Sequence, residues 1–277
     1  MNGIGAVPQI FDSVVPVVLL EIVLNLAGLV SLWRYAASPA ARRAPRLLPA
    51  WEASLGDFLL FLLLAFIGGF GLGAAASRAL RGSALDADLR LLIAGGALEA
   101  GMLAGAAVYA FGFNRGKAPA LPPAPAAALA SGAVTFLAAL PVMNAVSLVW
   151  QNLLQLCGLP VEKQEMVDLL INSRSPLTRG LLILLATVGA PLMEEIVFRA
   201  GLFRYLRTRL PRWAAFLIPA LLFGAAHGNL AYFAPLTVLG LVFSFAYERT
   251  GRIGTTIVAH SLFNLNTIVL ILGGLGN

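Results

Sequence analysis

Two adjacent carboxylates and one guanidinium stand in an apolar stretch, GAPLMEEIVFRAGLF, residues 189–203. Glu195 and Arg199 are four residues apart, so on a helix they share a face and can form an ion pair. Consecutive helical residues point about 100° apart, so Glu194 projects elsewhere and the two acids should not share a partner. The spacing predicts a structural Glu195–Arg199 pair and a carboxylate, Glu194, that is available for chemistry.

Both histidines of the chain, His227 and His260, fall in apolar segments that follow this stretch. Asn264 lies four residues after His260 and shares its helical face. A glutamate, a histidine and a water form a hydrolytic site, in which one group takes the proton of the water and the other holds it. A histidine and an asparagine can donate hydrogen bonds to a developing oxyanion. The alternative is a metal site, since Glu and His are good zinc ligands.

These side chains need helices to position them, and the composition places those helices in a membrane. Apolar residues make up 59% of the chain and charged residues 12%, whereas a soluble domain carries roughly 25% charged residues. A helix needs about 20 apolar residues to cross the hydrocarbon core. The fold predicted is an all-α polytopic membrane protein with about eight transmembrane helices. The predicted spans cover residues 13–33, 57–77, 91–113, 127–157, 179–203, 213–229, 231–248 and 253–273.

Prolines and charges predict where these helices are interrupted. Pro141 predicts an irregular part in the long fourth span, and the Pro-rich segment 117–126 is a connector that cannot continue a helix. Segment 161–176 alternates apolar and charged residues, which favours an amphipathic helix lying on the membrane surface. Pro191 should bend its span just before the acids and leave the carbonyl of Thr187 without its helical donor.

The charged residues also predict the orientation of the chain. The odd-numbered loops carry twelve of the 19 Lys and Arg residues and the even-numbered loops carry six. Since basic residues collect in cytoplasmic loops, both termini are predicted outside. The richness in Ala, Leu, Arg and Gly is typical of a high-GC bacterium, and the expected location is the bacterial inner (cytoplasmic) membrane.

The remaining residues exclude other partners and leave two acids unassigned. The net charge of +6 comes without a basic run interleaved with aromatics, so nucleic acid is not an expected partner. The single cysteine, Cys157, excludes an internal disulfide. Glu21 and Glu99 each stand alone in an apolar segment, where the simplest interpretation is an acid protonated by burial or bonded to another helix.

Three motifs together resemble one known family. EEIVFR (194–199), FGAAH (223–227) and HSLFN (260–264) match, in order, E-E-x-x-x-R, F-x-x-x-H and H-x-x-x-N. These are motifs of the CPBP family, the type II CAAX prenyl endopeptidase and bacteriocin-processing (Abi-like) family. The resemblance covers residues 161–273 and implies an α-helical intramembrane endopeptidase. The chain has no H-E-x-x-H or G-x-S-G motif, which other intramembrane proteases need.

The resemblance also implies roles for single residues. Glu194 and His227 would activate the water, while His260 and Asn264 would stabilise the oxyanion. Glu195, Arg199 and Phe223 occupy supporting positions of the motifs. We expect no cofactor, because asparagine is a poor zinc ligand and a good donor. If zinc is present, its expected ligands are Glu194, His227 and His260.

The expected organisation and partners follow from this resemblance. Residues 1–125 would form three N-terminal spans and the connector, and residues 126–277 the catalytic bundle. The expected substrate is a membrane-embedded or lipid-anchored protein or peptide. The alternative functions are a non-catalytic scaffold or bacteriocin immunity protein of the same fold, and a proton-coupled transporter using Glu21, Glu99 and Glu194. A transporter of that kind should show inverted repeats, and the sequence has none that we can detect.

Overall fold

The computed structural model describes residues 6–114, 124–162 and 165–275, and every regular element in these ranges is a helix. The longer α-helices are α1 (Ala6–Leu32), α3 (Leu55–Ala79), α4 (Ala87–Val108), α5 (Pro125–Leu156), α10 (Arg212–Ala226), α11 (Leu230–Thr250) and α12 (Ile253–Leu270). The shorter ones are α2 (Pro39–Arg43), α6 (Glu165–Asn172), α7 (Pro176–Leu184), α8 (Ala190–Glu194) and α9 (Arg204–Arg207). Five π-helical segments continue them: η1 (Trp33–Ala37), η2 (Tyr109–Phe113), η3 (Leu185–Gly189), η4 (Glu195–Phe203) and η5 (Ile271–Leu275).

Seven helices in the described part of the chain are long and apolar enough to cross a membrane. They present large apolar side chains outward: Val30 is 65% exposed and Phe70 63%. The prediction of a polytopic all-α membrane protein is confirmed. The sixth predicted span, 213–229, differs, because it is the shorter helix α10 of 15 residues. At 1.5 Å per residue α10 is about 22 Å long, less than the ~30 Å hydrocarbon core.

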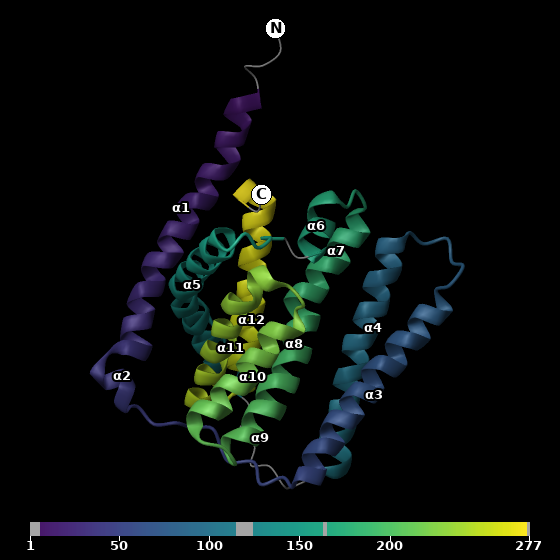
Figure 1. The fold of residues 1–277 in the computed structure, drawn as a ribbon, viewed down its shortest axis with the longest axis vertical. Coiled ribbons are helices and arrows are strands. Elements are labelled where there is room, and N and C mark those ends of the chain that lie inside the picture. The colour runs from purple at the N-terminus through teal and green to yellow at the C-terminus, as the bar shows by residue number, and fades with distance from the viewer. Residues whose placement is uncertain (1–5, 115–123, 163–164, 276–277) are drawn as a thin grey trace.

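Helix α12 lies in the middle of the bundle, between α5, α11 and the kinked helix that runs from α7 to α9 (Figure 1). Buried residues of α5, α11 and α12 pack into one core cluster: Phe136, Ala139, Leu140, Met143, Leu239, Phe243 and Ala259. Helix α1 packs on the outside of α5, and the α3–α4 hairpin forms the opposite side of the molecule (Figure 1).

Glycines allow α3 and α4 to pack closely. A Cβ atom at Gly68 or Gly101 would collide with the backbone of the facing helix, and one at Gly105 would collide with Leu64. Small residues at such crossings let helices associate in lipid, where the hydrophobic effect gives no driving force. The hairpin is attached to the rest of the bundle by an aromatic cluster around Trp51, whose ring contacts Phe58, Phe61, Tyr109 and Tyr205 of α9. Phe58 of α3 also stacks on Tyr205.

Three expected irregularities can be compared with the structure. Helix α5 continues through Pro141 without a break, so the predicted irregular part is absent. Gly28 of α1 packs against the ring of Pro141 and the carbonyl of Leu137. Most of the Pro-rich connector lies outside the described residues. The amphipathic segment near 161–176 forms only α6, and its Leu170 is buried in a protein core with Leu92, Leu182 and Ile268.

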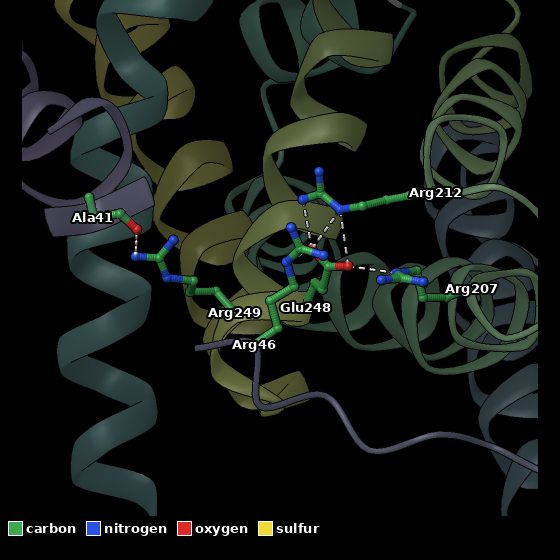
Figure 2. Close-up of polar contacts among 6 residues, drawn as sticks. All are labelled: Ala41, Arg46, Arg207, Arg212, Glu248 and Arg249. Atoms are coloured by element: carbon green, nitrogen blue, oxygen red, sulfur yellow. Dashed lines mark hydrogen bonds and ion pairs between the residues drawn. The ribbon is translucent and has the colours of Figure 1, made fainter. Parts of the chain in front are cut away.

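One buried carboxylate connects three segments (Figure 2), at the end of the bundle opposite α6 (Figure 1). Glu248, 3% exposed near the end of α11, contacts Arg207 at 2.6 Å, Arg212 at 2.8 Å and Arg46 at 3.6 Å. Its backbone carbonyl accepts from the N–H of Leu47 at 3.1 Å. The first and fifth loops, predicted to share one side of the membrane, therefore meet at this carboxylate near the end of α11.

Candidate active site

The two adjacent acids lie in a single kinked helix formed by α7, η3, α8, η4 and α9, residues Pro176–Arg207. Glu194 ends α8 and Glu195 begins η4. A π-helical segment, η3, lies directly before Ala190, at the place where the sequence predicts a bend. In a π-helix each N–H donates to the carbonyl five residues back, and such segments are frequent at functional sites.

The predicted ion pair between Glu195 and Arg199 forms inside the protein. Both side chains are buried, and Arg199 Nη1 lies 3.0 Å from Glu195 Oε1, although the contact lacks the alignment of a hydrogen bond. The guanidinium carbon lies 4.2 Å from the ring centre of Phe223 and 5.3 Å from that of Phe243. Cation–π contacts of this kind stabilise a cation that has been removed from water.

His260 of α12 lies between the two acids. Its Nδ1 is 3.0 Å from Glu195 Oε1, and its Nε2 is 3.9 Å from Glu194 Oε2. The prediction that the two acids would not share a partner is therefore wrong. The two ring nitrogens lie on different edges of the imidazole, so one ring reaches two side chains that diverge from the helix.

His227 lies in the turn between α10 and α11, where it is the C-cap of α10. The prediction that it stands within a span was wrong, because the helix ends before Gly228, whose φ of 63° is in the left-handed region. Its Nδ1 lies 2.8 Å from the carbonyl oxygen of Phe223. A carbonyl only accepts, so Nδ1 carries the hydrogen and Nε2 of a neutral ring is an acceptor.

Asn264 is held by a carbonyl that a proline has left free. Its Nδ2 donates to the oxygen of Ala186 at 2.7 Å. In η3 the N–H of Ala190 donates to the carbonyl of Leu185, five residues back. In the same register the carbonyl of Ala186 would accept from the N–H of residue 191. Residue 191 is a proline and has no N–H, so this carbonyl lacks a helical donor. We predicted that Pro191 would free the carbonyl of Thr187, as in an α-helix. In the π register it is the carbonyl of Ala186.

The cavity between these helices has a volume of about 400 Å³. Four of the residues identified in the sequence line it: Glu194, His227, His260 and Asn264. Glu195, Arg199 and Phe223 do not line the cavity and lie behind it, where Phe223 packs edge-on against both His227 and His260. Most of the remaining wall is apolar and comes from α5, α6, α11 and α12.

The possible zinc ligands do not form a metal site in the described residues. No group of three or more His, Cys, Asp or Glu side chains there is arranged to hold a metal ion. Glu194, His227 and His260 face one cavity but do not converge as three ligands of a tetrahedral ion would.

Residues 176–266 match the model of a family described as type II CAAX prenyl endopeptidase Rce1-like. The resemblance to the CPBP family is confirmed. A Bacillus subtilis (strain 168) protein named "Putative membrane peptidase YdiL" is 33% identical over 90 residues, 32% of this chain and 37% of that protein. The chain thus aligns with little more than a third of the length of this relative. No solved structure matches the chain.

The matched segment, residues 176–266, contains every motif residue, but the cavity wall extends beyond it. Glu99 of α4 lines the cavity although sequence reasoning left it unassigned. An acid at membrane depth was the only signal in the sequence that could have identified it. Glu21 does not line the cavity; its carboxylate lies 3.4 Å from Asn25 on its own helix.

Proposed function

We propose that the protein is an intramembrane endopeptidase that hydrolyses a peptide bond of a membrane-embedded or lipid-anchored substrate. One observation carries the proposal: Glu194, His227, His260 and Asn264, from three separate motifs, face the same cavity. The match of this segment to a CAAX endopeptidase family supports the same reaction class. The largely apolar wall suits a substrate that arrives through the bilayer.

Glu194 is the proposed base. Its Oε2 accepts no hydrogen bond from a described residue and lies 3.9 Å from His260 Nε2, beyond hydrogen-bonding distance. A reacting water between these two atoms would be within reach of both. Glu194 takes a proton from the water as its oxygen attacks the carbonyl carbon, and His227 Nε2 accepts the other O–H and orients the water.

The oxyanion that forms on the carbonyl oxygen needs donors. Asn264 uses one N–H on Ala186, which fixes the amide plane and leaves its second N–H for the oxyanion. His260, with both nitrogens protonated, donates from Nδ1 to Glu195 and from Nε2 to the oxyanion. Glu194 then returns its proton to the leaving nitrogen, and the carbon–nitrogen bond breaks.

The test uses purified full-length protein in lipid nanodiscs with a library of single-span peptides, and products are identified by mass spectrometry. Glu194→Gln should abolish cleavage and keep the fold, because an amide cannot take the proton of the water. Glu21→Gln is the matched control, an acid in a membrane helix that does not line the cavity, and should cleave like the wild type. Cleavage by Glu194→Gln within a few-fold of the wild type would remove Glu194 from this role.

Metal content and chelator sensitivity are measured on the same preparations. The proposed chemistry gives cleavage that resists chelators and a wild type without stoichiometric metal. Stoichiometric zinc that is lost together with activity in His260→Ala would overturn the metal-free chemistry. A wild type that cleaves no member of the library, nor any protein in native membranes when compared with Glu194→Ala, would favour a non-catalytic scaffold or immunity protein.

A further inference from the structure

A second carboxylate, Glu99 of α4, lines the cavity that holds the candidate active site. It comes from outside the matched segment, residues 176–266, and reaches the cavity because α4 packs against α8. Its carboxyl group lies directly over Gly189: a Cβ atom at this position would collide with Glu99 Oε2. The missing side chain at residue 189 therefore makes room for this carboxyl group beside the helix that carries Glu194.

Glu99 has no partner for its charge among the described residues. Its Oε2 is buried and accepts no hydrogen bond there. The cavity wall in this part of the chain contains two acids, Glu99 and Glu194, but no lysine or arginine. The buried basic groups nearby are engaged elsewhere: Arg199 with Glu195 and the aromatic rings behind the cavity, and His260 with Glu195 and Glu194. The cavity is thus acidic and otherwise mostly apolar.

A carboxylate in such a place is costly unless a cation or a hydrogen-bond donor meets it. The donors that a peptide substrate can bring are its backbone N–H groups and the side chains of lysine and arginine. Only the basic side chains also compensate the negative charge of the wall. The pairing would be strong because the surroundings are apolar and exclude water.

We propose that Glu99 is a specificity-determining residue that binds a lysine or arginine side chain of the substrate. This inference rests on the proposed endopeptidase function and names its substrate class. Gly189 and Glu194 are five residues apart, which is about 7 Å along a helix axis. An extended peptide advances about 3.3 Å per residue. The basic residue of the substrate therefore lies within about two residues of the bond that is hydrolysed.

The test is a competition between matched substrates. Full-length protein in nanodiscs receives a library of single-span peptides in which each member with a lysine near its centre has a counterpart with norleucine there. Norleucine keeps the length of the side chain and removes its charge. The measurement is the ratio of the two cleavage rates in one mixture, which does not depend on how much of each preparation is active.

The wild type should cleave lysine members about 10- to 100-fold faster, the range expected for a charge-assisted hydrogen bond. Glu99→Gln should bring this ratio close to one, because an amide cannot compensate a cation. Glu21→Gln, which changes an acid outside the cavity, should keep the wild-type ratio.

Three results would overturn the inference while leaving the endopeptidase proposal intact. They are a wild-type ratio near one, an unchanged ratio in Glu99→Gln, and a ratio lost equally in Glu21→Gln, since the effect would then not come from the cavity. If the wild type cleaves no peptide and no native membrane protein, the proposed function fails, and this inference fails with it.

Discussion

At the scale of single residues, the buried pair of Glu195 and Arg199 organises the site without facing it. Glu195 forms a hydrogen bond with Nδ1 of His260. This contact orients the imidazole so that its other nitrogen, Nε2, faces Glu194. The guanidinium in turn lies against the Glu195 carboxyl group in surroundings where a lone carboxylate would be costly. The pair therefore has a structural role and also positions a neighbouring imidazole.

Arg199→Leu should lose folded protein as well as activity, because it leaves a buried carboxylate unpaired at a cost of about 3–5 kcal/mol. The double variant Glu195→Gln/Arg199→Leu should recover much of that loss, since the amide carries no charge and its oxygen still accepts from His260 Nδ1. The measurement is the unfolding temperature and the monodisperse fraction in detergent. If the double variant is less stable than Arg199→Leu alone, the unpaired charge is not the cause of the loss.

The same residues show how far the sequence alone could lead. The spacing of Glu195 and Arg199 was enough to predict their pair, and the two histidines and Asn264 were identified with no structure. What the spacing could not give was the shared contact of both acids with His260. That contact depends on the position of α12 relative to η4, which is a matter of tertiary packing and not of local periodicity.

At the scale of elements, the π-helical register determines which backbone carbonyl lacks a helical hydrogen-bond donor. The sequence located the bend at Pro191, but an α-helical register assigned the free carbonyl to Thr187 instead of Ala186. Helix type within a kinked span depends on packing against neighbouring helices, so residue pattern alone did not determine it. The difference matters because Ala186 is the group that orients Asn264.

Pro191→Ala tests this arrangement. The variant supplies an N–H that can bond Ala186 and compete with Asn264, so it should reduce turnover on the order of 10²-fold, as Asn264→Ala should. Because the helix gains a hydrogen bond and loses a proline, the unfolding temperature should stay the same or rise. Pro16→Ala, a proline in α1, is the control and should keep the wild-type turnover. A Pro191→Ala protein with full turnover would show that the freed carbonyl is not needed.

At the scale of the whole molecule, the site depends on parts of the chain that the motifs do not cover. The predicted boundary near residue 125 separates the motifs from α4, yet Glu99 of α4 lines the cavity. The Trp51 cluster joins the N-terminal hairpin to α9, and Glu248 joins the first loop to α11 (Figure 2). Such contacts join residues far apart in the sequence, so no pattern along the chain could indicate them.

The orientation of the molecule in the membrane is a prediction at this scale. The arginines around Glu248 lie at one end of the bundle, and α6 lies at the other, near the end of α12 (Figure 1). Since basic loops face the cytoplasm, the end with Glu248 should be cytoplasmic and the end with α6 external. The single cysteine, Cys157, is exposed and is the C-cap of α5, between α5 and α6 in the chain.

Cys157 therefore reports the orientation of the wild-type protein without an engineered cysteine. In right-side-out spheroplasts, a membrane-impermeant maleimide should modify Cys157 of the wild-type protein. In the double variant Cys157→Ser/Ala40→Cys, the new thiol stands at an exposed position of α2, on the predicted cytoplasmic side. It should react only after the membrane is permeabilised. The reverse pattern, with Ala40→Cys modified in sealed spheroplasts and Cys157 protected, would place both termini in the cytoplasm and invert the predicted orientation.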